Sequence, residues 1–153
     1  MRLDDSSREP YEKPYMELTG HPGSTYLAAL RLTTAAILGD LLYSYEDVAQ
    51  AQVMVEEMYH LVLRGSPDPV LDSDLRVTTR FYLRRDGVEI ALVDPFDALE
   101  EVTATSEGME SLAVLRALSA DVQVDHGPPG VLRVLKRKGA DPAYSLVGTL
   151  WNC

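Results

Sequence analysis

Residues 75–94 read LRVTTRFYLRRDGVEIALVD, and this stretch decides the fold class. Between Leu75 and Leu83 every second side chain is apolar or threonine, and the intervening ones are mostly polar. This is the period of a strand with one buried face. Asp86-Gly87 is typical of a hairpin turn, after which residues 88–94 form the next strand. The stretch therefore predicts an antiparallel hairpin that places one face in a core.

Two amphipathic helices are expected before the hairpin. The first covers residues 26–42, with Ser24 placed to cap it and apolar residues at three- and four-residue spacing. The second begins at Ser44, with Asp47 three residues later in the capping-box position. Its expected buried stripe is Val48, Ala51, Val55, Met58 and Val62. Residues 15–19, ahead of both helices, are predicted as a short edge strand.

After the hairpin, residues 95–106 are expected to form a connection to a third helix at 109–118, with Leu112, Leu115 and Leu118 facing inward. Residues 121–125 and 131–136 then form a second hairpin. This order predicts an α+β fold, a two-layer sandwich with helices on one face of a mixed, mainly antiparallel sheet. The expected organisation is a flexible arm at 1–14, one domain at 15–138 and a tail at 139–153.

Composition narrows the classes of function. The chain has 153 residues and a formal net charge of −10, which disfavours direct contact with nucleic acid and suits a basic protein partner. No apolar run reaches the roughly 20 residues that span a bilayer. The first 14 residues have no apolar signal core, and the single cysteine, Cys153, lies in no metal-ligand spacing. We therefore expect a cytoplasmic protein without a membrane partner.

Four short segments occupy distinctive places in this order of elements. They are QVMVEEMYHLV at 52–62, VDPFDA at 93–98, EGME at 107–110, and the pair DVQV at 121–124 with GVLRV at 130–134. With their order and spacing, residues 16–136 resemble the ATP-binding domain of the GHKL superfamily. Histidine kinases, DNA gyrase and bacterial anti-sigma serine kinases share that domain. The short single-domain form is most similar to the anti-sigma kinases.

The resemblance implies roles for individual residues. Glu57 matches the glutamate that activates the attacking group, and Asp94 matches the aspartate that accepts a hydrogen bond from the adenine amino group. Gly108 matches a glycine of the loop that cradles the phosphates. Leu61 stands where the family has the asparagine that helps to hold Mg²⁺.

The same comparison identifies departures from the family pattern. Phe96 and Ala98 replace both glycines after Asp94, and Glu110 replaces the second glycine of the phosphate loop. Val131 replaces the usual threonine of the last hairpin. We therefore expect no cofactor, with ATP as the alternative, and a degenerate pocket around Asp94, Gly108, Leu61 and Phe96.

Several of these residues also have an ordinary structural interpretation. Glu57 is equally typical of a solvated helix position, Asp94 of a turn before proline, and Gly108 of a plain loop. His60 lies four residues after Glu56, which predicts a surface pair rather than a metal site. The basic strand positions (Arg76, Arg80, Arg84 and Arg85) are predicted to form a solvated sheet face.

Three functions follow from these observations. The first is a binding module, an anti-sigma-like homodimer that binds a sigma factor or a STAS-domain anti-anti-sigma protein, with Arg31 and its neighbours as candidate contacts. The second is an active serine/threonine protein kinase that phosphorylates a STAS-domain antagonist and uses Glu57 as its base. The third is a catalytically inert scaffold of the same fold. The losses at Leu61, Phe96, Ala98 and Glu110 weigh against the second.

Overall fold

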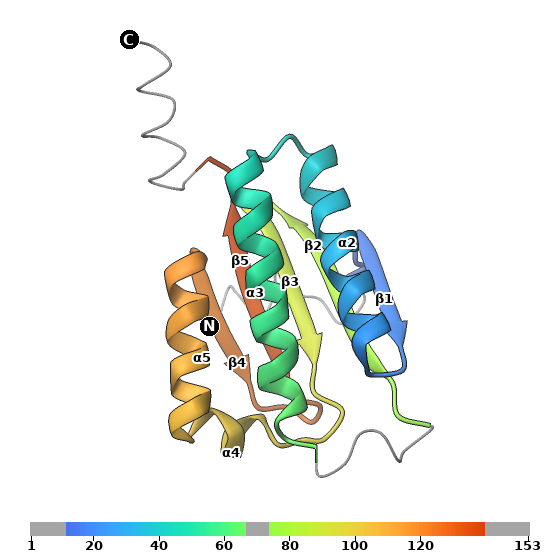
Figure 1. Ribbon diagram of the computed structural model, residues 1–153, viewed down its shortest axis with the longest axis vertical. Coiled ribbons are helices and arrows are strands. Elements are labelled where there is room, and N and C mark those ends of the chain that lie inside the picture. Colours follow the sequence, from blue (N-terminus) through green and yellow to red (C-terminus); the bar gives the residue numbers. More distant parts are fainter. Residues whose placement is uncertain (1–11, 67–73, 140–153) are drawn as a thin grey trace.

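A computed structural model describes residues 12–66 and 74–139. The predicted arm falls mostly, and the predicted tail almost entirely, outside these residues. The elements are β1 Met16–Gly20, α2 Ser24–Asp40, α3 Tyr45–Leu63, β2 Val77–Arg84, β3 Gly87–Val93, α4 Leu99–Thr103, α5 Ser106–Leu118, β4 Asp121–Asp125 and β5 Val131–Arg137 (Figure 1).

The strands form one sheet in the order β1-β2-β3-β5-β4, and each of the four pairings is antiparallel. Helices α2, α3 and α5 lie side by side on one face of this sheet, with α3 in the middle (Figure 1). The predicted α+β class, a two-layer sandwich with the helices on one face, is therefore confirmed.

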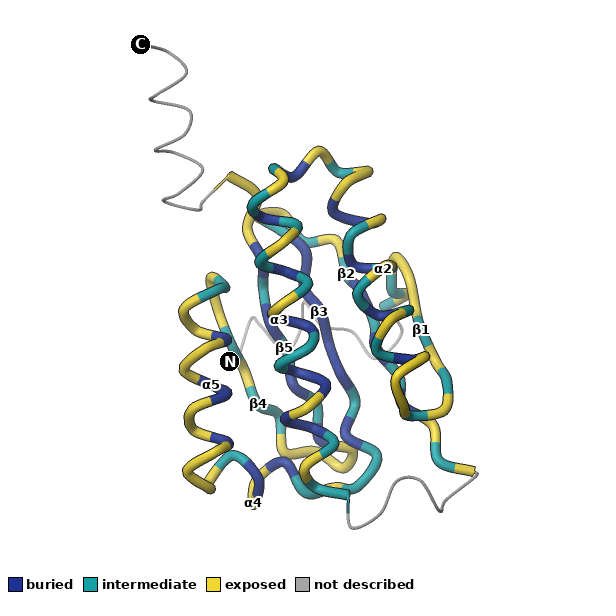
Figure 2. Tube along the Cα trace, in the orientation of Figure 1, coloured by how far each residue is buried: buried dark blue, intermediate teal, exposed yellow. Residues whose placement is uncertain are grey.

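The core lies between the two layers, where buried residues of α2, α3, β2, β3 and β5 form one apolar cluster. Figure 2 shows buried positions along these elements. Val77, Thr79 and Phe81 are buried, as the period of two predicts. On α3, the predicted residues Ala51, Val55, Met58 and Val62 are also buried. Each large apolar side chain removed from water in this way contributes about 1.5–3 kcal/mol.

Three local predictions need correction. Ser24 does not cap α2: Gly23 occupies the N-cap position and no side chain bonds there. Strand β2 begins at Val77 rather than Leu75. The connection at 95–106 is not plain loop, because it contains the helix α4 and the first residue of α5. By contrast, Ser44 caps α3 as predicted, with its hydroxyl accepting from the Asp47 amide at 3.1 Å.

Two tyrosines fix the edge of the sheet to the helices. The Tyr26 hydroxyl donates to the Leu18 carbonyl at 3.0 Å and lies 2.8 Å from the Thr79 hydroxyl. Tyr59 stacks on Tyr26, and its hydroxyl accepts from the Gly23 amide at 2.7 Å. Burial raises the pKa of Tyr26 to about 12, so this anchor is protonated and neutral at physiological pH.

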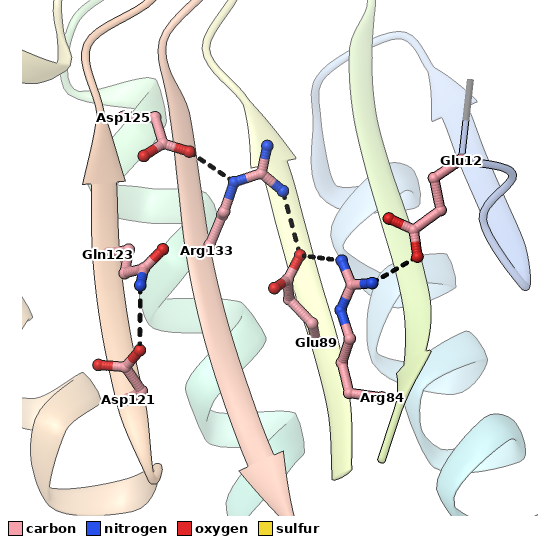
Figure 3. A network of polar contacts seen from close by, with 7 residues as sticks. All are labelled: Glu12, Arg84, Glu89, Asp121, Gln123, Asp125 and Arg133. Carbon is pink, nitrogen blue, oxygen red and sulfur yellow. Dashed lines mark hydrogen bonds and ion pairs between the residues drawn. The ribbon is translucent and has the colours of Figure 1, made fainter. Parts of the chain in front are cut away.

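The face of the sheet away from the helices carries a chain of ion pairs rather than an open row of cations (Figure 3). The buried Glu89 carboxylate on β3 accepts from Arg84 and Arg133, at 3.1 Å from each guanidinium. Glu12 pairs with Arg84, and Asp125 with Arg133. Burial opposes the charge on both arginines, but these carboxylates raise the pKa of each.

The prediction of a solvated basic strand face holds for Arg76 and Arg85, which are exposed, but the other two arginines are paired with carboxylates. Arg84 is bonded on two sides, and Arg80 pairs with Glu17 at 2.8 Å. Each positive charge at these two positions is therefore balanced by a neighbouring carboxylate.

Candidate functional site

The residues predicted to line a nucleotide pocket gather at one end of the sandwich. Strand β3 ends there at Val93, helix α3 ends at Leu63 and helix α5 begins at Ser106, with α4 between them (Figure 1). Three close approaches define the packing: Gly65 against Ala98, Gly108 against Val102, and Gly130 against Leu99. Short helix α4 therefore fills the end of the sandwich where the resemblance implies a nucleotide.

Asp94 is 2% exposed, and its carboxylate bonds its own loop. One oxygen accepts from the Phe96 amide at 2.9 Å, while the other accepts from the amides of Ala98 and Leu99 at 2.6 and 3.0 Å. The aspartate thereby folds the loop back and supplies the amides at the start of α4 with an acceptor. Three backbone donors already occupy the carboxylate that the resemblance assigns to an adenine amino group.

Leu61 and Ala98 take part in the apolar packing at this end of the sandwich. Leu61 is fully buried and belongs to the same apolar cluster as Leu99 and Val102 of α4. A Cβ on Gly65 would lie 2.7 Å from the Ala98 Cβ, so the loop after β3 rests directly on the end of α3. An asparagine in place of Leu61 would put an amide into this apolar cluster.

Phe96 and Glu110 lie on the outer side of this packing. Phe96 is half-buried in the loop, and Glu110 is exposed on the first turns of α5. A carboxylate near a helix N-terminus is favourable for the helix and repels an incoming phosphate. The Glu110 carboxylate would therefore weaken the binding of a nucleotide phosphate at this end.

Gly108 is buried at the start of α5, and its amide donates to the Thr105 hydroxyl at 3.0 Å. A Cβ at this position would lie 1.9 Å from the Val102 carbonyl oxygen. The glycine is therefore required by the contact between α5 and α4, which accounts for its presence without a phosphate loop. Thr105 is the N-cap that the sequence analysis missed, although a threonine three residues before Gly108 is a typical capping signal.

Glu57 lies on α3, one turn before Leu61, and is half-buried. Within residues 12–66 and 74–139 its side chain makes no hydrogen bond or ion pair. The structure thus brings Leu61, Asp94 and Gly108 to the same end of the molecule. The role predicted for Glu57 as a base stays a prediction.

Arg31 lines a different feature, an outer groove between α2 and α3 of about 470 Å³. Its guanidinium lies 3.3 Å from the Glu56 carboxylate, which also lies 3.8 Å from the His60 imidazole. The predicted surface pair of Glu56 and His60 is confirmed. The apolar part of the lining comprises Ala28, Leu32, Ala49 and Val53.

Leu32 and Val53 were missed because they fall outside the buried stripes of their helices. Their side chains are 69% and 52% exposed, although leucine and valine are normally buried. Such residues on two adjoining helices make an apolar surface that water solvates poorly. The signal was present in the sequence as apolar residues on the outer side of each helix.

Among the described residues, no three histidine, cysteine, aspartate or glutamate side chains are grouped as metal ligands would be. The described helices also include none with the length and apolar character needed to cross a membrane. In comparisons with protein-family models and with curated proteins, no match to this chain was found.

Proposed function

We propose that this protein is a regulatory binding module of the anti-sigma type, which binds a sigma factor or a STAS-domain protein through the outer groove of α2 and α3 in the cytoplasm. The observation that carries the proposal is the groove itself. Exposed Leu32 and Val53 flank Arg31, so apolar area and a charged group are presented together. Clustered exposed apolar residues of this kind mark protein interaction sites.

The packing around Asp94 and α4 supports a binding function over a kinase. Asp94 is bonded to its own backbone, Leu61 is in the core and Gly108 fits against α4. Each of these three positions has a structural role in the absence of nucleotide. The order of elements is the remaining support for the GHKL resemblance.

A homodimer remains part of this proposal. Strand β1 is an edge strand that pairs only with β2 in the described sheet, and its first residue, Met16, is exposed together with the preceding Tyr15. Unpaired edges of this kind are usually covered. A second copy would cover β1 without occupying the groove that contains Arg31.

The proposal is tested by capturing partners from a host lysate on the immobilised full chain and identifying them by mass spectrometry. We expect a sigma factor or a STAS-domain protein, and we expect Leu32→Glu to weaken binding of the purified partner at least tenfold, about 1.4 kcal/mol. Val114→Glu, at an exposed apolar position on α5, is the matched control and should bind normally. Capture of neither class, or equal binding by both variants, would contradict the proposal.

Calorimetric titration with ATP and Mg²⁺ separates the binding module from the kinase alternative. We expect no binding in the micromolar range, because Leu61 offers no oxygen to Mg²⁺ and the Asp94 carboxylate already has three donors. Each lost charge-assisted contact costs about 1.5–3 kcal/mol, so two such losses weaken binding by roughly a hundredfold or more. Micromolar affinity, or phosphate transfer that Glu57→Ala abolishes, would establish the kinase instead.

A further inference from the structure

The hairpin between β2 and β3 closes the end of the sandwich opposite to α4, beside the loop that joins α2 to α3 (Figure 1). A hollow of about 390 Å³ opens there between the hairpin, the loop and the residue that follows β5. We call it the hairpin-end hollow, and it is lined in part by Leu41, Tyr43, Leu83, Arg85, Val88 and Lys138. It shares no residue with the groove of α2 and α3 or with the packing around Asp94.

The floor of this hollow is apolar because the buried face of the sheet continues past the end of the helix layer. Leu83 continues the buried phase of β2 set by Thr79 and Phe81, yet it is 45% exposed. Helix α2 ends at Asp40, so the short loop before α3, rather than the helix, lies near this end of the strand. Leu42, in that loop, has a φ of 63° and is 78% exposed.

The floor is held in place by Tyr43. Its hydroxyl donates to the Lys136 carbonyl at 3.0 Å, which ties the loop to β5, and burial raises the pKa of this tyrosine. The shape of the hollow is therefore fixed by the fold rather than by a ligand.

The rim is positively charged, although the whole protein carries −10. Arg85 and Lys138 are exposed at the rim, and within the described parts of the chain neither has a carboxylate partner. Asp86, the only acidic residue in the lining, is paired with Arg137 at 3.2 Å. Arg84 is balanced by Glu12 and Glu89. Two uncompensated cations thus stand over an apolar floor.

We propose that the hairpin-end hollow binds a short acidic peptide segment of another protein, with a leucine- or phenylalanine-sized side chain on the floor and carboxylates at Arg85 and Lys138. The charge complementarity is local. An acidic segment of a few residues meets only the two cations, whereas a long polyanion or an anionic membrane would also meet the acidic remainder of the surface and be repelled. The apolar floor supplies area that a free inorganic anion does not use.

The test uses the full chain labelled with ¹⁵N and a synthetic peptide, Gly-Asp-Glu-Leu-Phe-Glu-Asp-Gly, followed by amide chemical shifts. We expect saturable shifts centred on Leu83, Gly87 and Lys138, and affinity that falls as salt is added. The charge-reversal variant R85E/K138E should weaken binding at least tenfold. R64E/R116E makes the same change of charge at exposed positions elsewhere and should bind like the parent.

Leu83→Ser tests the floor separately and should weaken binding about fivefold while leaving the charged rim intact. R85E/K138E, R64E/R116E and Leu83→Ser all change exposed side chains, so we expect each variant to fold. Dispersed amide spectra check this. The proposal is overturned if the peptide shifts lie elsewhere, or if R64E/R116E weakens binding as much as R85E/K138E. It is also overturned if inorganic phosphate, or vesicles containing phosphatidylglycerol, compete as well as the peptide does.

Discussion

Asp47→Ala is expected to lower the free energy of unfolding by about 3–5 kcal/mol, because it leaves a buried lysine without its counter-charge. Asp47 is fully buried and Lys136 is 5% exposed, with the ammonium 3.6 Å from the carboxylate. The same ammonium donates to the Gln50 amide oxygen at 2.8 Å and to the Leu118 carbonyl at 3.1 Å. This cluster joins the start of α3, the end of α5 and β5.

A double-mutant cycle measured by urea denaturation separates the pair from its surroundings. Lys136→Met alone leaves a buried carboxylate and should also destabilise, whereas Asp47→Ala with Lys136→Met removes both charges and should recover much of the loss. Glu17→Ala removes one partner of the exposed pair with Arg80 and should cost about 1 kcal/mol or less. A loss below about 1 kcal/mol for Asp47→Ala would show that the pair does not stabilise the fold.

For one member of this pair, Lys136, the sequence pattern already indicates burial. Lys136 continues the buried phase of Leu132 and Val134 on β5, so the pattern placed a lysine in the core. Asp47 was interpreted as a capping-box residue and as a favourable charge in the first turn of α3, where it does lie, with its amide bonded to Ser44. That interpretation did not include its ion pair with Lys136. Periodicity locates apolar faces, but it does not identify a partner 89 positions away, because that requires the order of strands in the sheet.

The candidate site was predictable to a similar extent. The resemblance implied that Leu61, Asp94 and Gly108 lie together, and the structure brings them to one end because α3 and β3 stop there and α5 begins there. A nucleotide site at this end stays a prediction. Helix α4 was missed because five residues are too few to display a helical period. Its start depends on the Asp94 carboxylate, which reaches four and five residues forward to the Ala98 and Leu99 amides. A capping side chain that lies several residues before the helix does not produce a recognisable capping pattern in the sequence.

Gly108→Ala is expected to lower the free energy of unfolding by about 3 kcal/mol or more, with no nucleotide present. The added Cβ would lie 1.9 Å from the Val102 carbonyl oxygen, 2.9 Å from the Val102 carbonyl carbon and 3.0 Å from the Thr103 Cα. All three atoms are backbone, so relief requires α5 to move away from α4. Overpacking that side chains can relieve costs about 1–3 kcal/mol, and here no flexible side chain is available to move.

Gly39→Ala is the matched control, because a Cβ at that position of α2 meets nothing within 4 Å. Alanine is favoured over glycine inside a helix by about 1 kcal/mol, so this variant should be slightly more stable than the parent. Urea denaturation followed by circular dichroism measures the free energy of unfolding of both variants.

The comparison also decides the role of Gly108. If it is kept for a phosphate loop, Gly108→Ala will leave the stability of the free protein unchanged and alter only nucleotide affinity. A large loss without ligand assigns it to the contact between α4 and α5, which closes the end of the sandwich where the resemblance would place ATP.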